Sequence, residues 1–70
     1  MQSFWTLEIN GESRELPPVR DIGELLKVLG VAPDRIAIEV NRRIIRKIDW
    51  ERTPLHDRDR IEIVQFVGGG

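Results

Sequence analysis

The feature that most constrains the fold of this chain is the stretch over residues 61–70. It joins an alternating, β-branched segment at residues 61–67 to three consecutive glycines at residues 68–70. Alternation of apolar and polar side chains predicts a half-buried strand. Glycines that follow a strand have no side chain to pack and lose the most backbone freedom on ordering. We therefore expect one domain over residues 1–67 and a flexible tail over residues 68–70.

A slim glycine tail suits chemistry inside another protein. It could thread a narrow channel and present the terminal carboxylate of Gly70 there, with Gly68 and Gly69 giving access. A carboxylate is a poor electrophile, and activation as an acyl-adenylate by a partner that binds ATP and Mg²⁺ would let a sulfur nucleophile attack it. The alternative is an inert tail, because chain ends are commonly loose and glycine-rich.

The rest of the composition argues against an enzyme or a metal site. A chain of 70 residues with 40% apolar residues forms one modest core without an internal active-site cavity. It contains no cysteine, and therefore no disulfide, thiolate ligand or thiol nucleophile. His56 is the only histidine, so no metal-binding constellation is present.

The charge balance argues against nucleic-acid binding as the main task. The chain has 11 basic and 12 acidic residues, a net charge of −1, whereas binding to phosphates needs a basic excess. A local basic cluster at residues 42–47 is typical of a solvated hairpin. No signal peptide or apolar run long enough to span a membrane is present, so a cytoplasmic protein without membrane contact is expected.

Alternating patterns predict a hairpin at the start of the chain. Residues 4–9 form a first strand and residues 12–16 a short, polar second strand. Asn10-Gly11 between them favours a type I′ turn, which needs positive φ at both central residues. Pro17-Pro18 ends the second strand, since neither proline can donate to a ladder.

A short helix follows. Asp21 and Glu24 have the spacing of a capping box, and Gly30 favours a left-handed helix end. Between them, four apolar residues share one helical face: Ile22, Leu25, Leu26 and Leu29. Gly23 is a weak point, because glycine inside a helix costs about 1 kcal/mol relative to alanine.

The second half of the chain predicts more strands. Residues 36–40 form a third strand, Asn41-Arg42 a turn, and residues 44–45 part of a fourth strand. Residues 48–51 form one helical turn or an irregular crossover, with Trp50 packed at the edge of the core.

These patterns together specify an α+β fold. One helix with a single apolar face can cover one side of a mixed sheet of four to five strands, with the first and last strands adjacent in its centre. The predicted arrangement is a β-grasp, or ubiquitin-like, fold.

Particular segments carry a family resemblance. They are Ile36-Ala37-Ile38-Glu39-Val40-Asn41, Asp49-Trp50-Glu51, Thr53-Pro54-Leu55 and the run from Asp59 to Gly70. Together with the Asn-Gly hairpin and the helix bearing Glu24-Leu25-Leu26, they resemble the ThiS family, sulfur carrier proteins of thiamine (thiazole) biosynthesis. The resemblance covers nearly the whole chain.

The resemblance implies a cycle of chemistry at Gly70. A ThiF-type enzyme would adenylate this glycine with ATP, and a sulfur donor such as a cysteine desulfurase would convert it to a thiocarboxylate. A ThiG-type thiazole synthase would then take the sulfur, while the chain itself would hold no cofactor. Two turns depart from the family pattern, because Arg42 and Arg58 stand where glycine is frequent. These departures call the geometry of both turns into question.

By analogy with ubiquitin-like proteins, the partner should dock on the outward side of the last strand. Alternation places Ile61 and Ile63 inward, and Glu62, Val64 and Phe66 outward. An exposed Val and Phe beside a polar rim would suit a partner. The alternative is that a loop covers both side chains.

Other functions fit the same tail. A MoaD-like small subunit of molybdopterin synthase would deliver sulfur to a pterin precursor, but that family often has prolines before its glycines, and residues 65–67 have none. A carrier for another thiolation pathway, a modifier joined to lysines through Gly70, and an interaction domain with an inert tail remain alternatives.

Overall fold

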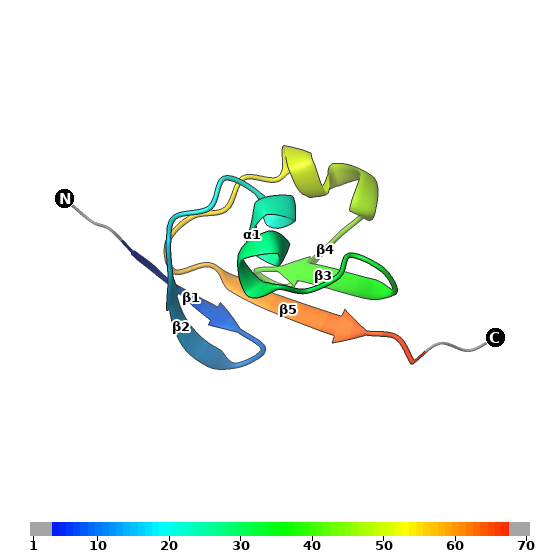
Figure 1. Cartoon of the computed structure of the whole chain (residues 1–70), viewed down its shortest axis with the longest axis horizontal. Coiled ribbons are helices and arrows are strands. Elements are labelled where there is room, and N and C mark those ends of the chain that lie inside the picture. The colour runs from blue at the N-terminus through cyan, green and yellow to red at the C-terminus, as the bar shows by residue number, and fades with distance from the viewer. Residues whose placement is uncertain (1–3, 68–70) are drawn as a thin grey trace.

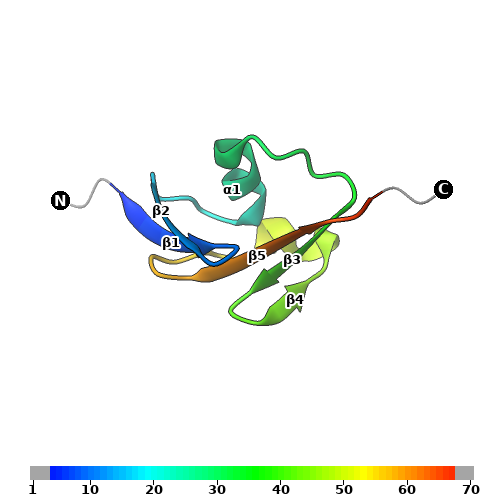
Figure 2. The ribbon, with the colours of Figure 1, turned by 90° about the horizontal axis from the view of Figure 1, so that it is seen from below.

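Five strands form one mixed sheet in the computed structural model, which describes residues 4–67. The strands are β1 (Trp5–Ile9), β2 (Glu12–Leu16), β3 (Ile36–Val40), β4 (Arg43–Ile45) and β5 (Arg60–Gln65), in the spatial order β2-β1-β5-β3-β4. β1 and β5 are parallel, and the other neighbouring pairs are antiparallel. The helix α1 (Ile22–Leu29) lies across one face of this sheet (Figures 1 and 2). The predicted α+β arrangement of a β-grasp is confirmed.

The first and last strands are adjacent, as predicted. Ile9 pairs with Ile61, and the backbone N–H of Asn10 donates to the carbonyl of Ile61 at 2.9 Å. Residues 68–70 lie outside the described part of the chain, so the expected tail stays a prediction. Figure 1 shows that β5 points along the long axis of the domain toward the C-terminal side.

β5 begins and ends earlier than the sequence pattern indicates. It covers Arg60–Gln65 rather than residues 61–67. The reason is its neighbour, because Gln65 pairs with Ile36, the first residue of β3. One more backbone contact follows, in which the N–H of Phe66 donates to the carbonyl of Arg35 at 2.7 Å. A strand therefore ends where its partner ends, even though its own sequence continues to alternate.

The hydrophobic core lies between the sheet and the helices. Its fully buried members include Leu7, Ile22, Leu25, Ile38 and Ile61. The 3₁₀ helix η1 (Lys47–Arg52) closes one side, and it is longer than the single turn expected over residues 48–51.

Trp50 seals the edge of this core on η1. Its side chain is buried, and its indole Nε1 donates to the carbonyl of Ile45 at 3.1 Å. The indole thus buries its apolar body and satisfies its one donor. The expectation that Trp50 packs at the edge of the core is confirmed.

Both ends of α1 follow the predicted signals. Oδ1 of Asp21 accepts from the backbone N–H of Glu24 at 2.9 Å. The carboxylate of Glu24 reaches back to the N–H of Arg20 at 2.7 Å, one residue before the position that a capping box uses. Gly30 ends the helix with φ of 71°, in the left-handed region.

The two turns with arginine in place of glycine keep the left-handed backbone. In the β3–β4 turn, Asn41 and Arg42 have φ of 50° and 70°, which are the signs that a type I′ turn requires. Arg58, in the turn before β5, has φ of 76°. Arginine therefore occupies conformations in which Cβ is crowded by the backbone.

Gly23→Ala is expected to stabilise the domain by about 0.5–1 kcal/mol, because alanine removes the entropy cost of glycine in a helix. The added Cβ would lie 3.4 Å from Oδ1 of Asp21 and 3.5 Å from Cγ of Glu51, which is ordinary van der Waals contact. Urea denaturation of the variant and the wild type measures the difference. Gly30→Ala is the matched control, and it should destabilise the domain because φ is positive there. A lower stability for Gly23→Ala would contradict this interpretation.

Candidate functional site

The predicted docking residues lie on β5 and just beyond it. Val64 is 49% exposed and Phe66 is 55% exposed, whereas Ile61 is fully buried. Glu62 and Ile63 are intermediate, and Ile63 packs against the core. The inward and outward faces are therefore assigned as the sequence predicted, and Val64 and Phe66 remain exposed. Their role in docking stays a prediction.

Strand pairing extends this exposed surface beyond the residues that the sequence singled out. In the register of the sheet, Ala37 of β3 lies opposite Val64. Ile44 of β4, which pairs with Glu39, is 74% exposed. Because paired residues share a face, Ala37, Ile44 and Val64 lie on the side away from α1. We call Ala37, Ile44, Val64 and Phe66 the outer patch.

On the same face of the sheet, charged residues lie between the outer patch and the start of β5. Glu39 and Glu62 are direct cross-strand partners, an arrangement that like charges make unfavourable. Further along, Arg60 pairs with Glu8, with 3.2 Å between Nε and the carboxylate oxygen. The outer patch is thus bordered by acidic residues and then by a basic end, which fits the polar rim of a protein interface.

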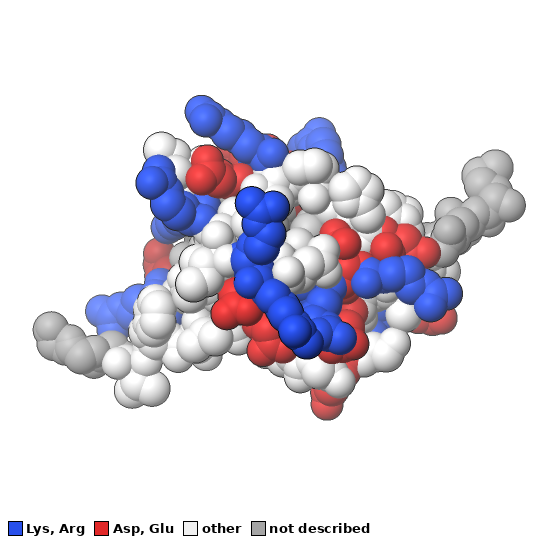
Figure 3. Space-filling view, turned by 180° about the vertical axis from the view of Figure 1, so that it is seen from behind, with Lys and Arg blue, Asp and Glu red and all other residues white. Residues whose placement is uncertain are grey.

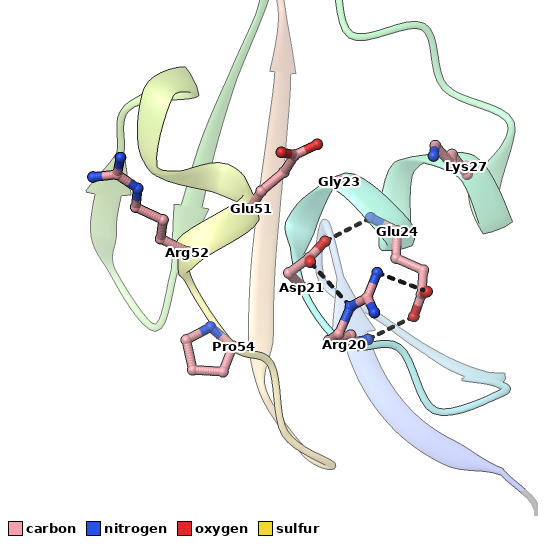
Figure 4. Close-up of a pocket in the computed structure, with 8 residues that line it drawn as sticks. All are labelled: Arg20, Asp21, Gly23, Glu24, Lys27, Glu51, Arg52 and Pro54. Atoms are coloured by element: carbon pink, nitrogen blue, oxygen red, sulfur yellow. Dashed lines mark hydrogen bonds and ion pairs between the residues drawn. The ribbon is translucent and has the colours of Figure 1, made fainter.

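A hollow elsewhere on the molecule is formed by residues that cap the helix α1. It has a volume of about 590 Å³ and lies between the start of α1 and η1. Figure 4 shows the guanidinium of Arg20 beside the carboxylates of Asp21 and Glu24, with Glu51 and Arg52 on the opposite wall. The distances from Arg20 to the two carboxylates are 3.5 Å and 3.9 Å. Since both carboxylates also accept backbone N–H groups of the helix start, they act as caps.

The charged turn around His56 is structural. One carboxylate oxygen of Asp57 accepts from the backbone N–H of Thr6 at 2.7 Å. Asp59 accepts from the backbone N–H of His56 at 2.8 Å, and its carboxylate lies 3.9 Å from the exposed imidazole. The carboxylate of Asp59 therefore stabilises the turn internally, and that of Asp57 connects the turn to β1. No group of three or more potential metal ligands gathers within residues 4–67.

Surface charge is mixed. Figure 3 shows basic and acidic side chains interspersed on one face, with uncharged surface between them. The basic side chains at residues 42–47 do not share one partner. Arg46 lies 3.8 Å from Asp49, and Nζ of Lys47 lies 5.9 Å from the ring centroid of Trp50. Among the described residues, no helix is both long and apolar enough to cross a membrane.

Fold and surface together define a class of protein. A ubiquitin-like β-grasp domain with an exposed apolar face beside the strand that leads to a glycine tail is the architecture of small carrier and modifier proteins. The particular family follows from comparison of the sequence. The model of the ThiS family matches residues 7–70, and the chain belongs to this family.

Known proteins agree with this assignment. The chain is 37% identical over 67 residues to the sulfur carrier protein ThiS of Bacillus subtilis, covering 91% of this chain and 98% of that protein. A crystal structure of the thiamine biosynthesis protein ThiS from Geobacter metallireducens superimposes with a TM-score of 0.79 at 28% identity, covering 93% of this chain and 99% of that one.

A third relative is much longer. The chain is 39% identical over 64 residues to the thiazole synthase of Paramagnetospirillum magneticum, covering 91% of this chain but 20% of that protein. The chain thus spans about a fifth of the length of such relatives. In them, a segment similar to this domain is part of a longer polypeptide.

Proposed function

We propose that this chain is a sulfur carrier that delivers sulfur to the thiazole of thiamine as a thiocarboxylate on Gly70. The observation that carries the proposal is membership of the ThiS family over residues 7–70, a range that includes all three tail glycines. The fold supports it, because β5 is held in the middle of the sheet and leads directly toward the tail.

Sulfur loading requires two steps at Gly70. A carboxylate oxygen attacks the α-phosphorus of ATP, pyrophosphate leaves, and an acyl-adenylate forms. A sulfide equivalent then attacks the carbonyl carbon, AMP leaves, and a thiocarboxylate remains. A ThiF-type adenylyltransferase binds the ATP. A donor such as a cysteine desulfurase supplies the sulfur as a persulfide, and a thiol reductant brings it to the sulfide level while being oxidised to a disulfide. The chain has no cysteine that could carry the sulfur as a persulfide, and the proposal therefore assigns the sulfur to Gly70.

The acceptor of the sulfur is a ThiG-type thiazole synthase. Support comes from relatives named thiazole synthase that contain a segment similar to this domain. A MoaD-like role in molybdopterin synthesis is the alternative. Binding of the chain to a ThiG-type thiazole synthase, without binding to the large subunit of a molybdopterin synthase, tests the pathway. The reverse preference would contradict it.

Val64→Asp and Phe66→Asp are expected to slow adenylation of Gly70 by about 10- to 100-fold, since interface anchors commonly have effects of this size. Both side chains are largely exposed, so the fold should be unaffected. Pyrophosphate release by a ThiF-type enzyme measures the rate, and circular dichroism checks the fold.

Ile48→Asp provides the matched control for this prediction. Ile48 is 65% exposed on η1, away from the outer patch. The same change of an exposed apolar residue to aspartate should leave adenylation at the wild-type rate there. Wild-type kinetics in folded Val64→Asp and Phe66→Asp would exclude the outer patch as the docking surface for the ThiF-type enzyme.

A further inference from the structure

Two arginines occupy backbone conformations that favour glycine. The turn formed by Asn41 and Arg42 repeats the geometry of Asn10-Gly11, whose φ angles are 51° and 82°. Glycine is the preferred residue at the second position of such a turn, and an arginine there destabilises the folded chain. Arg58 has the same disadvantage in the next turn. An arginine at each of two strained positions indicates a function that offsets the loss of folding stability.

The two turns meet at one hollow. Its volume is about 280 Å³, and it is lined by Glu8, Asn41, Arg42, Arg58 and Arg60. Asn41 joins the turns: its side-chain oxygen accepts from the N–H of Arg60 at 3.0 Å, and its own N–H donates to the carbonyl of Arg60 at 2.7 Å. We call these five residues the arginine hollow.

The arginine hollow has an excess of positive charge. Three arginines and one glutamate line it, and Glu8 is already paired with Arg60. Neither Arg42 nor Arg58 forms an ion pair within residues 4–67. Two guanidinium forks are therefore available to an anion. Such forks match the planar geometry of a carboxylate with paired hydrogen bonds.

The arginine hollow also lies next to the proposed docking surface. Glu8 and Arg60 alternate with the buried residues Ile9 and Ile61, so they face the side of the outer patch. Arg60 begins β5, whereas Val64 lies near its end. A partner that covers this face and receives the tail would therefore contact both surfaces.

We infer that the arginine hollow binds carboxylate side chains of the ThiG-type thiazole synthase, and that the synthase covers the outer patch after the ThiF-type enzyme has left it. This inference rests on the proposed function. A nucleic acid fits less well, because Glu39 and Glu62 on the same face repel a continuous polyanion. The synthase is favoured because relatives contain such a domain within the same polypeptide.

The test is the double variant Arg42→Gly/Arg58→Gly, assayed against a ThiG-type thiazole synthase by calorimetry at several salt concentrations. The affinity should fall by about tenfold at low salt, and its salt dependence should flatten. The melting temperature should rise by about 5 °C, because glycine relieves both strained turns. Weaker binding by a more stable protein separates recognition from a purely structural role.

Arg14→Gln/Arg52→Gln is the matched control. It also removes two positive charges, but Arg14 of β2 and Arg52 of η1 do not line the arginine hollow. Its affinity for the synthase should remain within about twofold of the wild type, because charges far from an interface are screened.

Each other outcome has a defined meaning. Equal affinity of the wild type and Arg42→Gly/Arg58→Gly would overturn the inference and leave the proposed function intact. A wild type that neither binds the synthase nor forms a thiocarboxylate would overturn both. Saturable binding of inorganic phosphate or an RNA oligonucleotide, lost in the double variant, would show that the arginine hollow recognises phosphate and would also overturn the inference.

Discussion

Gly69→Val is expected to lower the rate of adenylation at Gly70 by about a hundredfold or more, since small displacements of a reacting group have effects of this size. A β-branched side chain next to Gly70 widens the tail and restricts its backbone. The carboxylate would then be held out of line with the α-phosphate of ATP. Thiocarboxylate formation should be lost with it.

The measurement is pyrophosphate release by a ThiF-type enzyme, with the melting temperature as a check on folding. Val67 is already 97% exposed, so a substitution two residues further on should leave the melting temperature unchanged. Gly69→Ala is the graded control, because it adds one methyl group and should cause a smaller loss. Adenylation of Gly69→Val at the wild-type rate would show that a slim tail is not required.

Ile61→Ala is expected to remove most of the stability of the fold and to leave a substantial unfolded fraction at 25 °C. Ile61 is fully buried in β5, where it pairs with Ile9 of β1 and Val40 of β3. Truncating a buried isoleucine to alanine costs about 2–5 kcal/mol. A domain this small has a net stability of about 3–5 kcal/mol, so the loss is comparable with the total.

Urea denaturation followed by circular dichroism measures this effect. The matched control is Ile44→Ala on the neighbouring part of the sheet. Ile44 is 74% exposed, and its truncation should change the free energy of unfolding by less than about 0.5 kcal/mol. A cooperative transition of Ile61→Ala close to that of the wild type would contradict the assignment of Ile61 to the centre of the core.

Local signals in the sequence predicted much of the fold. The turn at Asn10-Gly11, the cap at Asp21 and the helix end at Gly30 all depend on residues within one or two turns of the backbone. For such features, the chemistry of a few neighbouring residues decides the conformation. The inward and outward faces of β5 were predictable for a similar reason, because alternation is a property of the strand itself.

Several features that depend on distant residues were not predictable, although the adjacency of the first and last strands was. The end of β5 is set by Ile36, 29 residues before Gln65 in the sequence. Ile44 belongs to the outer patch because β4 pairs with β3, and its own sequence neighbours do not indicate this. The arginine hollow arises where the turn at Arg42 meets the turn at Arg58. Alternating patterns describe strands one at a time and carry no register between them.

The candidate site also combines residues that the strand pattern predicts with a residue that rests on the family assignment. The docking residues Val64 and Phe66 were found from alternation, and the described structure shows both exposed. Gly70 has a different basis, because it lies outside the described residues and its proposed chemistry rests on membership of the family. The two parts are connected through β5, which contributes Val64 to the outer patch and precedes Phe66 and the tail in the sequence.

The most direct test of sulfur carriage is intact mass spectrometry of the protein taken from its own cells, with fragmentation of the C-terminus. We expect a species in which one carboxylate oxygen of Gly70 is replaced by sulfur. Fragment ions should place the mass difference on the terminal residue. A free carboxylate alone, even after incubation with ATP, sulfide and a ThiF-type enzyme, would contradict the proposal that this chain carries sulfur.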